Sequence, residues 1–261
     1  MNTRRSFRRR HWWVPAFWLI VAARLGAQVT ETPQTIAPGS FFLRMDAISI
    51  GVNRDRVEPS RYNALGLAST ILSTGLTRDV DLEVGVQFFV KQTVQLGGTR
   101  TSHSGRGDVS LRSKWTFWRD PTRGAAAAVI PYVKLPSNTG GVGNNHTEGG
   151  VIVPWSMSLG GGTELGAMGQ WDILRNAGNT RYDSRWFASG FLHQHLIGSL
   201  GAYAETTLAV SSASASTLAG TLGGGVTFDL KKKLQLDYGL SRGLGGQATD
   251  WIHVLRLRWE F

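Results

Sequence analysis

The last eleven residues of the chain alternate between apolar and polar side chains with a period of two. Trp251, Leu255 and Trp259 share the odd-numbered side, whereas Arg256 and Arg258 lie on the even-numbered side. Successive side chains of a strand point to opposite sides, so the pattern predicts a strand with one apolar and one charged face. In a tilted strand the two tryptophans would differ in height by roughly 20 Å, close to the apolar band of a transmembrane β-barrel.

The same alternation recurs from residue 41 onward in segments that glycine-rich and polar turn sequences separate, and no helical periodicity intervenes. We therefore predict an all-β chain that forms a single antiparallel transmembrane β-barrel over residues 41–261. Twelve strands are expected, an even number as in single-chain bacterial barrels. The expected strands span residues 42–52, 62–72, 80–91, 109–118, 125–135, 151–159, 163–174, 185–197, 200–210, 218–229, 234–241 and 251–261.

In the clearest segments the charged residues avoid the apolar face. A lysine or arginine that faced lipid at the bilayer midplane would cost about 2–4 kcal/mol, so a membrane would enforce this separation. The charged face is then expected to line the lumen, where the charges either form a polar pore or pair across the lumen and fill it. The predicted lumen residues are Glu83, Lys91, Arg112, Lys114, Glu164, Asp172, Glu205, Asp237, Arg256, Arg258 and Glu260.

Aromatic residues on the other face are expected at the two membrane interfaces. These residues are Trp115, Trp155, Trp171, Trp251, Trp259 and Phe261. The connectors alternate between short and long, as expected for a barrel with short periplasmic turns and longer outer loops. A soluble β-sandwich remains an alternative, because it would show the same alternation with its apolar faces packed between two sheets.

Two prolines fall inside predicted strands. Pro131 and Pro154 each remove a ladder hydrogen bond, and a closed barrel has no edge strand to accommodate them. We expect β-bulges at these positions, or strand boundaries that lie two or three residues away.

The first 27 residues have the pattern of a signal peptide for Sec-type export. A basic start is followed by an apolar stretch that is too short to span a bilayer, and Leu25-Gly26-Ala27 offers a cleavage site before Gln28. An uncleaved anchor is the alternative. Residues 28–40 are expected to be a loose periplasmic lead-in. Six arginines and no acid lie in residues 1–27, which leaves 22 basic against 18 acidic residues, so nucleic acid is not an expected partner.

Several short motifs resemble one family. Thr74-Gly75-Leu76-Thr77, Gly105-Arg106-Gly107-Asp108, Val133-Lys134-Leu135-Pro136 and Leu236-Asp237-Tyr238-Gly239 are similar to the outer-membrane family named for the MetA pathway of phenol degradation, over about residues 60–261. This resemblance implies an outer-membrane β-barrel of a Gram-negative-type bacterium that passes small solutes, including aromatic or other hydrophobic ones. The terminal Phe261 likewise resembles the signal that outer-membrane proteins present to the assembly machinery.

The chemistry-bearing residues are sparse. His193 and His195 could bind a metal, but no carboxylate or cysteine stands at ligand spacing, and no cofactor is expected. A lipid-modifying enzyme would need Ser189, His193 and Glu205 to meet as nucleophile, base and acid. The sequence therefore favours a passive channel whose partners are membrane lipid and a small-molecule solute. A closed structural or binding barrel is the second hypothesis, and an enzyme the third.

Overall fold

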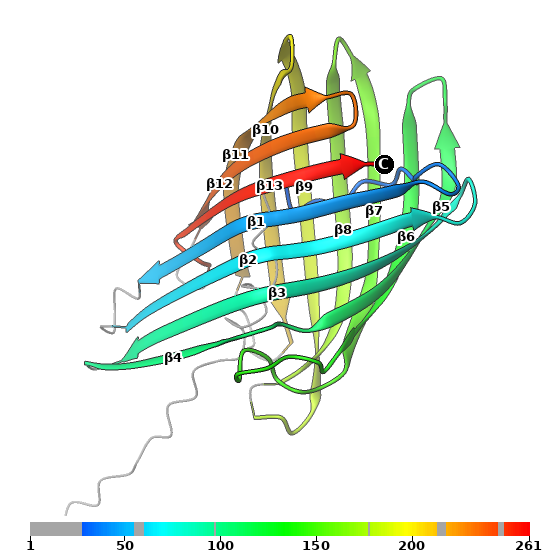
Figure 1. The fold of residues 1–261 in the computed structure, drawn as a ribbon. Helices are drawn as coiled ribbons and strands as arrows, with labels where there is room; N and C mark the ends of the chain where they lie inside the picture. The colour runs from blue at the N-terminus through cyan, green and yellow to red at the C-terminus, as the bar shows by residue number, and fades with distance from the viewer. Residues whose placement is uncertain (1–27, 55–59, 97, 177, 213–217, 245–247) are drawn as a thin grey trace, which may run out of the picture.

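The computed structural model describes residues 28–54, 60–96, 98–176, 178–212, 218–244 and 248–261, and the predicted signal peptide lies outside them. These residues form one antiparallel sheet, which closes on itself because β2 pairs with both β1 and β3 (Figure 1). The strands are β1 (Phe41–Arg54), β2 (Ser60–Gly75), β3 (Val80–Leu96), β4 (Thr99–Gly105), β5 (Val109–Asp120), β6 (Ala125–Leu135), β7 (Glu148–Gly160), β8 (Thr163–Arg175), β9 (Tyr182–Ile197), β10 (Leu200–Ser211), β11 (Leu218–Lys231), β12 (Leu234–Leu244) and β13 (Trp251–Glu260).

Twelve of these strands make up the barrel wall. The remaining strand, β4, pairs only with β3, whose first half pairs with β5 and whose second half forms a hairpin with β4. The predicted barrel of twelve strands is confirmed. Residues 93–106 are expected as a connector between the strands predicted over 80–91 and 109–118, but they form the end of β3 and the whole of β4, so this expectation is wrong. Turns of two to four residues join the strands at the end where the chain termini of the barrel lie, called here the turn end. The longer connections lie at the opposite end, called here the loop end.

The apolar residues of the wall point outward and the charged residues point inward. Trp115, Trp251 and Trp259 are 53%, 42% and 44% exposed, whereas Asp172 and Asp237 are completely buried. A sandwich would have the reverse arrangement, with its tryptophans between two sheets. Since there is a single closed sheet, the sandwich alternative is wrong. The described residues contain no helix of sufficient length and apolarity to cross a bilayer.

Both prolines lie within the strand ladders without a bulge. Pro154 of β7 is paired with Met168 and Pro131 of β6 with Val151, and the register is unchanged on either side. The expected bulges are therefore absent, since each proline lacks ladder contacts on one side only. The other expectation, a shifted strand boundary, is met by β7, which begins at Glu148, three residues before the predicted start. The observed register shifts lie elsewhere, as in β1 between Asp46 and Ile48.

Residues 28–36 pass through the lumen, and we call them the N-terminal segment. Thr30 is bonded to Glu205 of β10 and Ser189 of β9, while the backbone N–H of Ile36 donates to Asp81 of β3. The carbonyl of Gln28 accepts a bond from Arg256 of β13 at 2.7 Å. The prediction of a loose lead-in is wrong, because polar groups of the wall satisfy the backbone of this segment inside the barrel.

The connection between β6 and β7, residues 136–147, folds inward at the loop end, and we call it the inner loop. Asp108 holds its first turn by accepting bonds from the backbone N–H groups of Ser137 and Asn138, both at 3.0 Å. Val142 is 6% exposed, and its carbonyl accepts a bond from Gln92 of β3. The inner loop thus covers the lumen from the side opposite the N-terminal segment.

Candidate functional site

A cavity of about 260 Å³ lies in the lumen between the N-terminal segment and the inner loop. Its wall residues come from nine of the twelve wall strands, β1, β2, β3, β5, β6, β7, β8, β9 and β13. Apolar side chains such as Ile71 and Ile152 alternate in its lining with charged ones such as Arg44 and Arg112. The cavity can therefore hold a small molecule that has both a polar and an apolar part.

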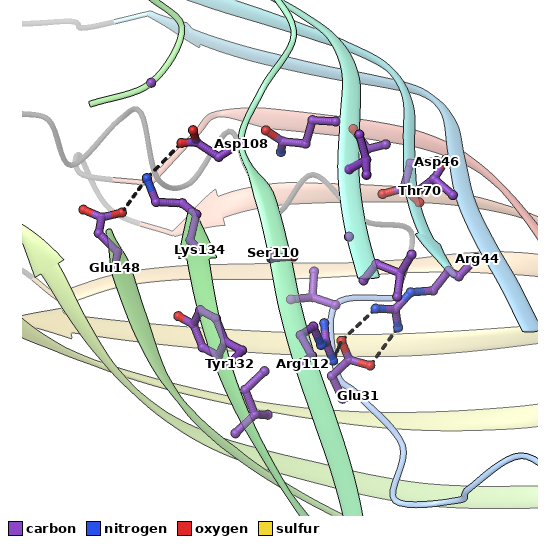
Figure 2. A pocket seen from close by; sticks show the side chains of 18 of the residues that line it. Glu31, Arg44, Asp46, Thr70, Asp108, Ser110, Arg112, Tyr132, Lys134 and Glu148 are labelled. Carbon is purple, nitrogen blue, oxygen red and sulfur yellow. Dashed lines mark hydrogen bonds and ion pairs between the residues drawn. The ribbon is translucent and has the colours of Figure 1, made fainter. Parts of the chain in front are cut away.

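One side of the cavity is formed by a carboxylate between two guanidinium groups (Figure 2). Glu31 accepts two bonds from Arg44, at 2.7 and 2.8 Å, and one from Arg112 at 2.9 Å. Burial opposes ionisation of Glu31, but Arg112 and Arg44 outweigh it and hold the pKa of this carboxyl well below its usual value. This arrangement joins β1 and β5 to the N-terminal segment.

A second polar cluster holds the inner loop (Figure 2). The Lys134 ammonium lies 2.8 Å from Asp108, 3.1 Å from Glu148 and 2.9 Å from the side-chain oxygen of Asn144. Three oxygen atoms thus surround one ammonium group, which is the number of protons that it can donate. The cluster fixes the inner loop against β6 and β7.

The remaining buried charges of the cavity wall are also paired. Arg185 donates two bonds to Asp172, at 2.9 and 2.5 Å, and the Tyr132 hydroxyl donates to the same carboxylate. Arg256 pairs with Asp46 at 2.6 Å. Buried charges of this kind persist only when each has a partner, so removing one of them would leave the other uncompensated.

Most of the predicted lumen residues are inside the barrel, although only Arg112 and Arg256 line the cavity. Several of the other predicted lumen residues form ion pairs or bind the N-terminal segment. Arg258 pairs with Asp237 at 2.8 Å, and Glu260 pairs with the exposed Lys233 at the turn end. The others inside are Glu83, Lys114, Asp172 and Glu205, which are buried, and Glu164, which is partly exposed.

Lys91 does not lie in the lumen, so its prediction is wrong. It is exposed, whereas its neighbours Val90 and Gln92 are buried. In the first half of β3 the buried positions are odd-numbered, as at Glu83, and in the second half they are even-numbered. The change coincides with the register shift in β1 and with a positive φ of 52° at Ala68 in β2, so the three strands change face together.

The predicted interface aromatics all occupy the outer side of the wall. Trp171 stacks on Trp186 of the next strand, and Phe261 lies against Trp259 and Phe41 at the turn end. Trp155 is partly buried, and the other five residues of the predicted set are exposed. Their height relative to a bilayer stays a prediction.

Sequence reasoning missed much of the cavity lining. Arg44 and Asp46 lie in a strand whose alternation the β1 bulge disrupts, and Glu31 lies in a polar stretch without any period. Lys134 and Glu148 lie at strand ends beside the inner loop. One signal was available: Arg44 and Asp46 are two residues apart and oppositely charged, a spacing that places both on one face of a strand.

The residues proposed for catalysis do not form a relay. Ser189 accepts a bond from Thr30, and Glu205 also binds Thr30. His193 lies 3.3 Å from the hydroxyl of Thr227. In the part of the chain that the structure describes, no group of three or more histidine, cysteine, aspartate or glutamate side chains is placed to hold a metal ion.

Residues 28–261 match the family model described as "Putative MetA-pathway of phenol degradation". Among curated proteins, none matches the sequence.

Solved structures of outer-membrane barrels share the fold at low sequence identity. An outer membrane channel from Pseudomonas putida F1 has a TM-score of 0.64 and 13% identity, with 88% of this chain and 98% of that chain covered. The β domain of the Bordetella autotransporter BrkA has a TM-score of 0.55 and 12% identity, over 86% and 100%. The KdgM porin in complex with disordered oligogalacturonate has a TM-score of 0.51 and 7% identity, with 85% of this chain and 99% of that chain covered. At these identities the likeness establishes the fold alone.

Proposed function

Because this chain belongs to the family described as "Putative MetA-pathway of phenol degradation", we propose that it is an outer-membrane channel that passes small solutes by passive diffusion. The observation that carries the proposal is the cavity of about 260 Å³, lined by charged and apolar side chains, in the lumen of a closed barrel. A lumen lined by paired charges and a few apolar side chains suits small solutes with both polar and apolar parts. The family description names phenol degradation, so small aromatic compounds are the first class to test.

In this proposal the N-terminal segment is the closed gate of the channel. It crosses the lumen and is held by the wall through charged and polar bonds, including those of Glu31 and Glu205. The segment is not part of the sheet, so it can leave the lumen without breaking the strand ladder of the barrel wall. The proposal places the turn end in the periplasm and the inner loop toward the outside.

Export and assembly follow from the same proposal. Residues 1–27 would direct Sec-type export to the outer membrane. The C-terminal strand β13 would be the element that the assembly machinery recognises. The Phe261 side chain is 51% exposed at the turn end, where a binding partner can reach it.

Conductance in planar lipid bilayers tests the channel and its gate. Deletion of residues 29–34 removes the part of the segment that crosses the lumen and retains the junction between Ala27 and Gln28. We expect small, infrequent openings from the full chain and a conductance several-fold larger after the deletion. A matched control deletes residues 178–180, in the connection between β8 and β9, and should leave conductance unchanged.

The alternative is a closed structural or binding barrel. The ion pairs Arg185–Asp172 and Arg256–Asp46 between neighbouring wall strands favour it, because these charges already satisfy one another without a solute. If the deletion variant is folded and inserted but does not conduct ions or take up small solutes into vesicles, the channel proposal is wrong and the closed barrel stands.

A further inference from the structure

The carboxylate between Arg44 and Arg112 does not belong to the barrel wall. Both guanidinium groups are carried by wall strands, β1 and β5, whereas Glu31 is carried by the N-terminal segment. The contact of Glu31 with Arg44 is bidentate, at 2.7 and 2.8 Å, which is the geometry by which arginine binds a free carboxylate. The wall thus presents a preformed receptor for a carboxylate, and the chain supplies one from its own segment.

The same three residues line the cavity, so a solute in the cavity reaches this receptor directly (Figure 2). Ile71 of β2 also lines the cavity and is the direct cross-strand neighbour of Arg44. Ile152 of β7, which is 2% exposed, contributes another apolar side chain to the cavity. The receptor therefore combines two guanidinium groups with an adjacent apolar wall.

We propose that Arg44 and Arg112 form a binding site for the carboxylate of a small apolar solute, and that Glu31 occupies this site when no solute is present. The inference rests on the proposed function, because the solute must enter the lumen. Binding exchanges one carboxylate for another, so Arg44 keeps a bidentate partner, while Arg112 stays paired with Glu83 of β3 at 2.7 Å in either state. The exchange also removes one anchor of the N-terminal segment, which couples occupancy of the site to opening of the gate.

Calorimetric titration of the full-length barrel in detergent with benzoate tests the site. Benzoate has one carboxylate on a small apolar ring, and benzamide is the control because it has the same ring without the charge. Glu31 competes from a tethered position, where its effective concentration is on the order of millimolar. The Glu31→Gln variant should therefore bind benzoate at least about tenfold more tightly than the parent.

Two further variants locate the site. Glu260→Gln makes the same substitution at the turn end, outside the cavity lining, and should leave benzoate affinity unchanged. Arg44→Gln, made in the Glu31→Gln background, should weaken benzoate binding by about tenfold or more, because the bidentate contact is lost. Each variant must migrate as a folded barrel in gel electrophoresis. If the double variant does not fold, the benzoate affinity of Glu31→Gln relative to the parent decides the inference.

Equal benzoate affinity in the parent and in Glu31→Gln would overturn the inference, as would benzamide binding as tightly as benzoate or no benzoate binding in any variant. These results are separate from the test of the channel. Titration in detergent does not require conduction, so benzoate can bind to a barrel that fails to conduct. Conversely, a conducting barrel that does not bind benzoate keeps the proposed function and loses this site.

Discussion

Glu205 of β10 anchors the N-terminal segment through its carboxylate. Its carboxylate accepts the backbone N–H of Thr30 at 2.7 Å, the Thr30 hydroxyl at 2.6 Å and the backbone N–H of Val29 at 3.0 Å. Thr30 and Glu205 are 3% and 5% exposed, so water does not replace these bonds while the segment remains docked. The Glu205→Leu substitution retains the approximate bulk of the side chain and removes every acceptor atom.

The magnitude follows from the two N–H groups that lose their acceptor. A buried donor without a partner costs about 1–3 kcal/mol, whereas the single proton of the Thr30 hydroxyl can turn to Ser189, 2.7 Å away, when the carboxylate is removed. Burial of the new leucine by the docked segment returns about 1 kcal/mol. We expect docking to weaken by about 3 kcal/mol, which corresponds to roughly a 150-fold larger undocked fraction. Glu205→Gln should lie between the parent and Glu205→Leu, because its amide oxygen retains one acceptor.

A cysteine in the segment measures this fraction. The chain has no cysteine, and Pro33 is among the fully buried side chains, so a thiol in Pro33→Cys reacts with maleimide only when the segment leaves the lumen. The labelling rate should rise by roughly 150-fold in Glu205→Leu and remain unchanged in the control Glu164→Leu, a lumen glutamate outside the contacts of the segment. A rise in the labelling rate of less than about threefold would refute the reasoning, because it would mean that the loss of the Glu205 carboxylate hardly weakens docking of the segment.

Three further outcomes are expected. The lowered pKa of Glu31 means that its contribution to docking is fully present above the ordinary value of 4.5 and is lost as the pH falls through the lower, folded value. Cleavage of the segment by pepsin should therefore increase only below pH 4.5, and a Glu31→Gln variant with the same acid response would contradict this assignment. Asp172→Ala leaves Arg185 buried without its partner, so the free energy of unfolding in lipid vesicles should fall by about 3–5 kcal/mol, against less than about 0.5 kcal/mol for Lys233→Met in the exposed pair with Glu260. Val84→Arg places a charge on the outer face of β3, where Val84 is 43% exposed. The free energy of unfolding in lipid vesicles should fall by about 2–4 kcal/mol. An unchanged free energy of unfolding would mean that this face does not contact lipid.

The barrel could be read from the sequence because its signal is local. A period of two is visible within a single strand, and the charged faces of separate strands agree without knowledge of which strands are neighbours. Arg256 and Arg258 were placed correctly on the inner face of β13 for this reason. The prediction for Lys91 is wrong because the apolar and polar residues of 80–91 alternate without a break, although the strand changes face between its two halves.

The contents of the lumen were decided by the tertiary structure. Glu31 and Arg112 are 81 residues apart, and Thr30 and Glu205 are 175 apart, so no spacing along the chain indicates that they meet. Residues 28–36 have neither a period nor a compositional bias toward order, and their conformation is set by donors and acceptors that the closed wall directs inward. Alternation along one strand determines which face a residue occupies, but only closure of the sheet brings those faces together around a buried segment and a cavity.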